Sequence, residues 1–208
     1  MASEWITPLR VNFINAALDK VCLICISPDS KMFFRTVYTE KEATAHHEAG
    51  HAVMAHRRQI RINRVSIARS PGRCEVLGFV EHSGKDTISN GEIPRERLNG
   101  RLLVSLAGLS AEYLFTGKKN LEAAASDLAV AELLLHDLTT AENRDDMAAA
   151  ALRECDEFLR QPENWRLVCL VARYLLDVEE TLDGKRLREV IQRLEVEMPS
   201  LESAVAGA

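Results

Sequence analysis

The chain has 208 residues, of which 47% are hydrophobic and 27% charged, and its formal net charge is −5. This length and apolar content suffice for one domain with a buried core. The mildly acidic balance and the scattered basic residues give no reason to expect a nucleic acid partner, and no window holds the roughly 18 apolar residues that cross a bilayer. With no signal peptide at the start, we expect a soluble, cytoplasmic protein without a membrane span.

The five cysteines follow no disulfide pattern, because their number is odd and their spacing irregular. We therefore expect reduced thiols. Cys22 and Cys25 have the CxxC spacing, but no second pair follows to complete a structural zinc site. Their apolar surroundings, residues 21–26, favour buried core residues over a redox pair.

The first clear structural signal lies at residues 39–42, after an N-terminal segment (1–38) of unknown role. Thr39 and Glu42 fit the capping box, in which the hydroxyl and the carboxylate bind free backbone N–H groups at a helix start. This pattern predicts a helix over residues 40–58.

The segment after this helix alternates apolar and polar residues over 62–69 and, more loosely, over 76–80. A turn cluster at 70–73 separates the two stretches, so the pattern predicts a β-hairpin.

From residue 94 onward, helical periodicity and capping residues predict a run of helices. Pro94, Asn120, Pro162 and Asp183 suit helix starts, and Gly117 suits a helix end. The expected helices cover residues 94–116, 121–138, 141–160, 162–180 and 184–197. The predicted fold is mainly α, in the α+β class: one domain over 39–198 with a small hairpin or sheet after the first helix, a C-terminal helical bundle and a frayed tail at 199–208.

The first predicted helix carries the pentapeptide His47-Glu48-Ala49-Gly50-His51. Positions i and i+4 share one face of a helix, so both imidazoles can bind one zinc ion. Glu48 directly follows the first histidine, which places its carboxylate beside the metal rather than on it. There it can act as a general base. The sequence therefore predicts a zinc site with Glu48 as the catalytic residue.

The alternative interpretation of this motif is a solvated helix face with two unrelated histidines. The alanines and valine that flank the motif argue against it. His46 and His56 point off the shared face, and we do not expect them to bind the metal. Gly50 costs stability inside a helix, which suggests that another element packs closely there.

A catalytic zinc needs a third protein ligand, and three residues downstream are candidates. His82 follows the second predicted strand, and Glu112 and Asp127 lie in apolar helical segments. An acid in such a segment is poorly hydrated unless it has a partner, which a metal would supply. Pairing with a basic side chain or a helix end is the alternative for Asp127.

Four blocks of the sequence resemble the FtsH-type peptidases of family M41, in the order of that family. The block around the pentapeptide, 46–52, is followed by residues 106–117, which resemble the family's LGGRAAEE…FG stretch. Residues 125–128 resemble its (A/S)-S-N-D-L segment, and 180–185 resemble ETLDGEE. The resemblance spans residues 39–195.

The resemblance implies a set of roles for this chain. His47, His51 and Asp127 would be the ligands of one zinc ion per chain, with Glu48 as the base. Glu112 matches a family acid that is not usually a metal ligand, and we expect it to hydrogen-bond a ligand histidine.

The sequence also departs from the family pattern. FtsH-type proteins usually carry an AAA+ ATPase module and a membrane anchor ahead of the peptidase, and this sequence has no G-x-x-x-x-G-K-[ST] motif. Leu109 and Tyr113 replace a family Arg and Glu. We therefore expect a stand-alone, ATP-independent peptidase domain that forms a homo-oligomer or works with a separate ATPase.

The expected activity is that of a zinc metalloendopeptidase acting on flexible or unfolded polypeptides. An extended substrate would add as a strand along the hairpin edge formed by Val76, Leu77, Gly78, Phe79 and Val80. One alternative is an inactive zinc-binding or regulatory module that recruits partners, although such a module has no need of Glu48. Another is a hydrolase of small amides with the same zinc chemistry.

Overall fold

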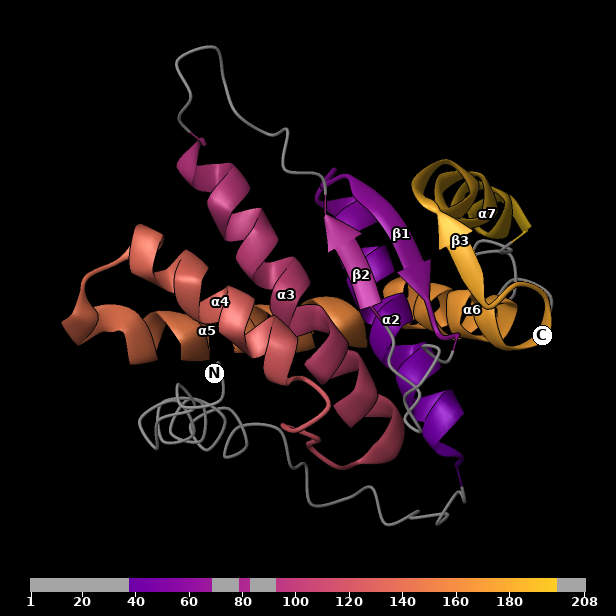
Figure 1. Cartoon of the computed structure of the whole chain (residues 1–208), viewed down its shortest axis with the longest axis horizontal. Helices are drawn as coiled ribbons and strands as arrows, with labels where there is room; N and C mark the ends of the chain where they lie inside the picture. The colour runs from indigo at the N-terminus through magenta and orange to yellow at the C-terminus, as the bar shows by residue number, and fades with distance from the viewer. Residues whose placement is uncertain (1–37, 69–78, 83–92, 198–208) are drawn as a thin grey trace, which may run out of the picture.

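The computed structural model describes residues 38–68, 79–82 and 93–197. It is a mainly helical fold with one small sheet, as the sequence predicts (Figure 1). The elements in chain order are α2 (Glu40–Arg57), β1 (Ile62–Ser66), β2 (Phe79–His82), α3 (Arg95–Thr116), α4 (Ala125–Leu138), the 3₁₀ turn η1 (Ala141–Asn143), α5 (Arg144–Arg160), α6 (Pro162–Asp177), β3 (Thr181–Asp183) and α7 (Gly184–Glu197).

Helix α2 is the central element, and every residue from 45 to 55 is buried. The predicted capping box starts it: the backbone N–H of Glu42 donates to Thr39 Oγ1 at 3.2 Å, and the Thr39 N–H donates to Glu42 Oε2 at 2.7 Å. Helices α3 and α6 pack along α2. The small residues of α2 permit this packing, because small side chains let neighbouring helices approach the helix axis closely.

Helix α2 ends in a Schellman motif. The Gln59 N–H donates to His56 O at 3.2 Å and the Ile60 N–H donates to Ala55 O at 2.8 Å. Gln59 occupies the left-handed region with a φ of 54°, which is usually reserved for glycine. The chain then turns directly into β1.

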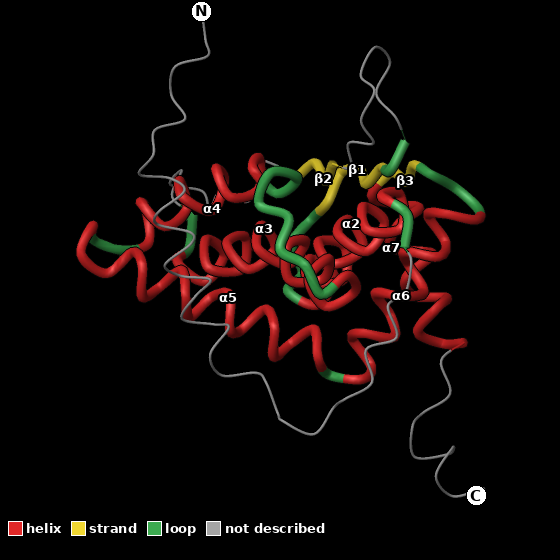
Figure 2. Tube along the Cα trace, turned by 90° about the horizontal axis from the view of Figure 1, so that it is seen from below, coloured by secondary structure: helices red, strands yellow, loops and turns green. Residues whose placement is uncertain are grey.

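The sheet has three antiparallel strands in the order β2-β1-β3. Val65 of the central strand pairs with Val80 on one side and with Leu182 on the other. The sheet lies along one side of the helices, with α5 and α6 toward the other side (Figure 2). Since α2 contacts both β1 and β2, the sheet covers one side of the metal-motif helix.

The other helices form the rest of the core. Helix α3 packs against α2, α4 and α5, so it connects the central helix with the α4–α5 pair. Leu102, Leu103 and Leu109 of α3 are almost completely buried. Within the described ranges, no helix is long and apolar enough to span a bilayer.

Several sequence predictions are confirmed. The hairpin pairing is present as β1 with β2, and Asp183 caps α7 by accepting from the N–H groups of Lys185 and Arg186, both at 2.8 Å. The close packing predicted at Gly50 also exists, since a Cβ there would lie 2.5 Å from Ala111 Cβ and 2.7 Å from Ala107 O.

Other predictions need correction at their boundaries. Helix α4 begins at residue 125 rather than 121, because residues 121–124 form a turn in which Asn120 Oδ1 accepts from the Ala123 N–H at 3.1 Å. Residues 141–143 form a 3₁₀ turn ahead of α5. Helix α6 ends at Asp177 instead of 180, and the strand β3 that follows was not predicted. The N-terminal segment up to residue 37, the CxxC pair and the tail 199–208 lie outside the described residues.

Candidate metal centre

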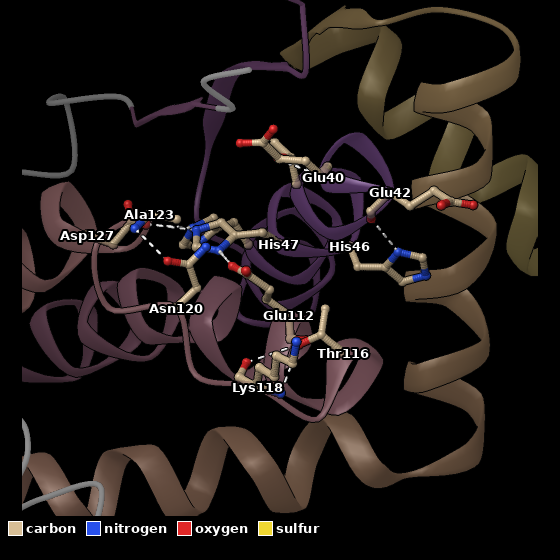
Figure 3. A network of polar contacts seen from close by, with 12 residues as sticks. Glu40, Glu42, His46, His47, Glu112, Thr116, Lys118, Asn120, Ala123 and Asp127 are labelled. Atoms are coloured by element: carbon tan, nitrogen blue, oxygen red, sulfur yellow. Dashed lines mark hydrogen bonds and ion pairs between the residues drawn. The ribbon is translucent and has the colours of Figure 1, made fainter. Parts of the chain in front are cut away.

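Two helices bring three potential metal ligands to one point. Helix α2 supplies His47 and His51, and the first turn of α4 supplies Asp127. Asp127 Oδ2 lies 2.9 Å from His47 Nε2 and 3.3 Å from His51 Nε2, and the three ligand atoms all lie within 4.8 Å of one another. Figure 3 shows Asp127 and Glu112 on two sides of His47. The sequence-predicted triad is therefore assembled in the fold.

The orientation of each imidazole is fixed at its other nitrogen. His51 Nδ1 lies 2.6 Å from the carbonyl oxygen of Val104, and His47 Nδ1 lies 3.0 Å from Glu112 Oε2. A carbonyl oxygen only accepts, so His51 Nδ1 carries the hydrogen and donates it. The same arrangement applies to His47, because the Glu112 carboxylate accepts. Both rings therefore direct Nε2 toward Asp127, as histidine ligands of metals do.

The chemistry of the three groups favours a bound cation. Two Nε2 lone pairs and a carboxylate oxygen meet at one place, and all three are stabilised by positive charge between them. The pKa values of these groups show the same preference for positive charge. Burial acts to lower the pKa of His47, but the hydrogen bonds to Asp127 and Glu112 outweigh it and raise that pKa to about 10.

The pKa values of His51 and Asp127 are also shifted by their mutual contacts. Burial acts to lower the pKa of His51 too, yet the charge of Asp127 raises it. Burial acts to raise the pKa of Asp127, but the two histidines hold it well below its usual range. The residues thus fit a divalent ion bound by two imidazoles and one carboxylate, a ligand set typical of catalytic zinc.

Space for an ion is provided by Gly108 of α3. A Cβ at this position would lie 2.6 Å from His47 Nε2 and closer still to His51 Nε2. Both contacts are shorter than real Cβ atoms make, so any side chain here would occupy the space in front of the two ring nitrogens. The absence of a Cβ at Gly108 is therefore part of the site.

The site is closed on the histidine side and open at Asp127. The side chains of His47 and His51 are 6% and 3% exposed, whereas that of Asp127 is 27% exposed. A water molecule or a substrate group can therefore approach a bound ion from the α4 side, and a catalytic metal requires such access.

Glu48 lies on α2 beside the ligands and is almost completely buried at 3% exposure. Its Oε2 has no hydrogen-bond partner among the residues that the structure describes. Burial raises the pKa of Glu48 to about 7, against the opposing charges of His51 and His47. A carboxyl group with a pKa near neutrality and one oxygen without a partner suits a general base.

His46 and His56, which the sequence places off the shared face of the helix, contact groups other than the triad. His46 is buried, donates from Nδ1 to Glu42 O at 2.8 Å and stacks on Phe115, with ring centroids 3.6 Å apart. In Figure 3 it lies on the far side of α2 from Asp127. His56 pairs with Glu195 at 3.3 Å.

Of the remaining candidates, Glu112 contacts a ligand histidine and not the shared point of the triad. His82 ends β2, and the orientation of its side chain lies outside what the structure describes. Of the predicted substrate edge, Phe79 and Val80 belong to β2, while Val76, Leu77 and Gly78 lie outside the described residues.

Two contributors to the site did not emerge from the sequence. The Val104 carbonyl is a backbone group, and its role leaves no trace in residue identity. Gly108 carried a usable signal, because a glycine inside a long apolar helix costs about 1 kcal/mol relative to alanine. The same signal at Gly50 predicts the close packing that α3 makes there.

Comparison with known proteins adds no assignment. No protein-family model matches the chain, and no curated protein matches it.

Proposed function

We propose that this protein is a zinc metallopeptidase that hydrolyses peptide bonds in flexible or unfolded polypeptides. The observation that carries the proposal is the convergence of His47, His51 and Asp127 beside the buried carboxylate of Glu48, whose Oε2 has no hydrogen-bond partner among the described residues. The same triad without a base would suit a structural ion. A base placed next to it points to hydrolysis.

Bound zinc would supply a Lewis acid that polarises the scissile carbonyl and makes water a stronger acid. The protein contributes the proton transfers. Glu48 Oε2 accepts a proton from the attacking water, and the same oxygen then delivers it to the leaving amine. Its burial supports this role, because burial raises the pKa of Glu48 to about 7, where the group can both take up and release a proton near neutral pH.

The resemblance to FtsH-type peptidases supports the same proposal. It implies that Glu112 hydrogen-bonds a ligand histidine, and Glu112 Oε2 lies 3.0 Å from His47 Nδ1. This contact orients the ring and raises the basicity of Nε2. Glu112 is thus a positioning residue for His47.

We further propose that the substrate binds as an extended strand along β2. In the described sheet, β2 is an edge strand, because it pairs with β1 alone. An edge strand offers free backbone groups on one side, and an extended peptide can satisfy them regardless of its sequence. A peptide N-methylated near the scissile bond should be cleaved more slowly than one N-methylated at its far end. Equal rates would refute strand addition.

The decisive test measures zinc content and casein cleavage in three proteins: wild type, Glu48→Gln and Asp127→Asn. Wild type should bind one zinc per chain and cleave casein. Glu48→Gln should bind zinc equally well without cleavage, because the amide cannot take up a proton. Asp127→Asn should lose most of its zinc.

Two results would overturn the proposal. Wild type that binds no zinc and cleaves nothing would remove its basis. Zinc binding with no cleavage of casein or of short peptides by wild type would instead favour a module that recruits partners.

A further inference from the structure

A cavity of about 600 Å³ lies at the C-terminal end of α2, against β1 and α7. Figure 1 shows α7 beside β3 and β1 at this end of the fold. Its volume lies in the range of small-molecule sites. The apolar part of its lining consists of Ala52, Ala55, Ile60, Ile62, Leu187 and Ile191. The lining includes none of the metal-centre residues.

The ionisable residues that line the cavity are all basic: His56, Arg61 and Arg188. His56 is engaged by Glu195. Among the described residues, neither Arg61 nor Arg188 forms an ion pair with a carboxylate. Asp183 attracts Arg188, but its carboxylate accepts from the backbone of Lys185 and Arg186. With two arginines and no carboxylate among the described residues that line it, the cavity favours an anionic ligand.

Gln59 supplies an independent indication. It lines the cavity, and its φ of 54° places it at the glycine-preferring position of the Schellman motif that ends α2. A residue with a Cβ is strained there, and glycine would relieve the strain. Residues held in a sparsely populated backbone conformation cluster at functional sites, and Gln59 is such a residue in the lining of this cavity.

We propose that this cavity binds a small organic carboxylate with an apolar chain. The carboxylate lies between Arg61 and Arg188, whose guanidinium groups match it geometrically. The Gln59 amide donates a further hydrogen bond. The apolar chain packs on the alanine and isoleucine side chains below. The proposal is independent of the metal centre.

The test is calorimetric titration of the full chain with decanoate, with decanol and inorganic phosphate as comparison probes. Decanoate should bind, and both comparison probes should bind at least about tenfold more weakly. Decanol lacks the carboxylate that the arginines would bind, and phosphate lacks the apolar chain. Arg61→Gln and Arg188→Gln should each weaken decanoate binding by about tenfold. Arg173→Gln is the matched control, because Arg173 is an exposed arginine of α6 outside the cavity lining.

Decanoate could also bind through a carboxylate–zinc contact, and Asp127→Asn distinguishes this case. The proposal requires that Asp127→Asn keeps decanoate binding. Binding that disappears with Asp127→Asn but survives Arg61→Gln would overturn it, and so would equal binding of decanol or the absence of decanoate binding.

Gln59→Gly separates a binding role from a structural one. This variant should raise the unfolding temperature, because it relieves the backbone strain, and should weaken decanoate binding several-fold. A gain in stability with unchanged decanoate affinity would show that Gln59 has no part in the site.

Discussion

Replacing Gly108 by alanine tests the geometry of the metal centre most directly. The added methyl group would lie 2.6 Å from His47 Nε2, whereas ordinary contacts start at 3.4 Å. To restore an ordinary contact the ring must retreat by about 0.8 Å (3.4 − 2.6), and His51 by more. Metal–ligand distances tolerate only about 0.2 Å. We expect zinc affinity to fall by at least about 100-fold, since both histidine ligands are displaced together.

Stability should change much less than zinc affinity. Overpacking costs about 1–3 kcal/mol, and the gain in helix propensity from glycine to alanine offsets about 1 kcal/mol of it. Zinc affinity is measured by competition with a chromophoric chelator, and stability by urea unfolding with the chelator EDTA present. Gly100→Ala is the control in the same helix, because a Cβ there would meet only the flexible end of Ile60, at 3.3 Å. Wild-type zinc affinity in Gly108→Ala would refute the assignment of this space to the metal.

Three other substitutions test separate parts of the structure. Glu112→Gln keeps an acceptor for His47 Nδ1, so zinc affinity should fall by only about tenfold in the chelator competition; complete loss of zinc would make Glu112 a ligand. Leu182→Ala should cost about 2–5 kcal/mol in urea unfolding, because this residue of β3 is fully buried, and a loss below about 1 kcal/mol would exclude β3 from the core. Burial raises the pKa of Asp156, so the folded state holds its proton more tightly than the unfolded chain, and stability falls as pH rises above the usual value of 3.8. Asp156→Asn should therefore stabilise the protein more at pH 7 than at pH 3, and an equal effect at both pH values would contradict this reasoning.

The parts of the fold that the sequence predicts well are those with local causes. The start of α2 follows from Thr39 and Glu42, which lie three residues apart and contact each other. Strand β3 has no comparable signal. It is three residues long, and it becomes a strand by pairing with β1, where Ser66 Oγ contacts Thr181 Oγ1 across 115 positions. Periodicity cannot be detected over so short a segment.

The candidate site shows the same division. His47 and His51 could be predicted together because helical geometry places them one turn apart. Asp127 is 80 positions from His47, and residue chemistry alone does not distinguish it from His82 and Glu112 as the third ligand. Only the resemblance to a family favoured it. The contributions of the Val104 carbonyl and of Gly108 depend on how closely α3 approaches α2, which no local pattern expresses.

The unequal burial of the ligands has a thermodynamic consequence. Both histidines belong to an enclosed helix, whereas Asp127 lies at the start of α4, after a turn, and is partly exposed. Release of a metal bound by these residues would then be linked to local opening of α4, while α2 is held by its packing. Zinc at 100 times its dissociation constant would stabilise the closed arrangement of α4 by about 2.7 kcal/mol. Amide hydrogen exchange in the first turn of α4 should therefore report metal occupancy, and exchange in α2 should not.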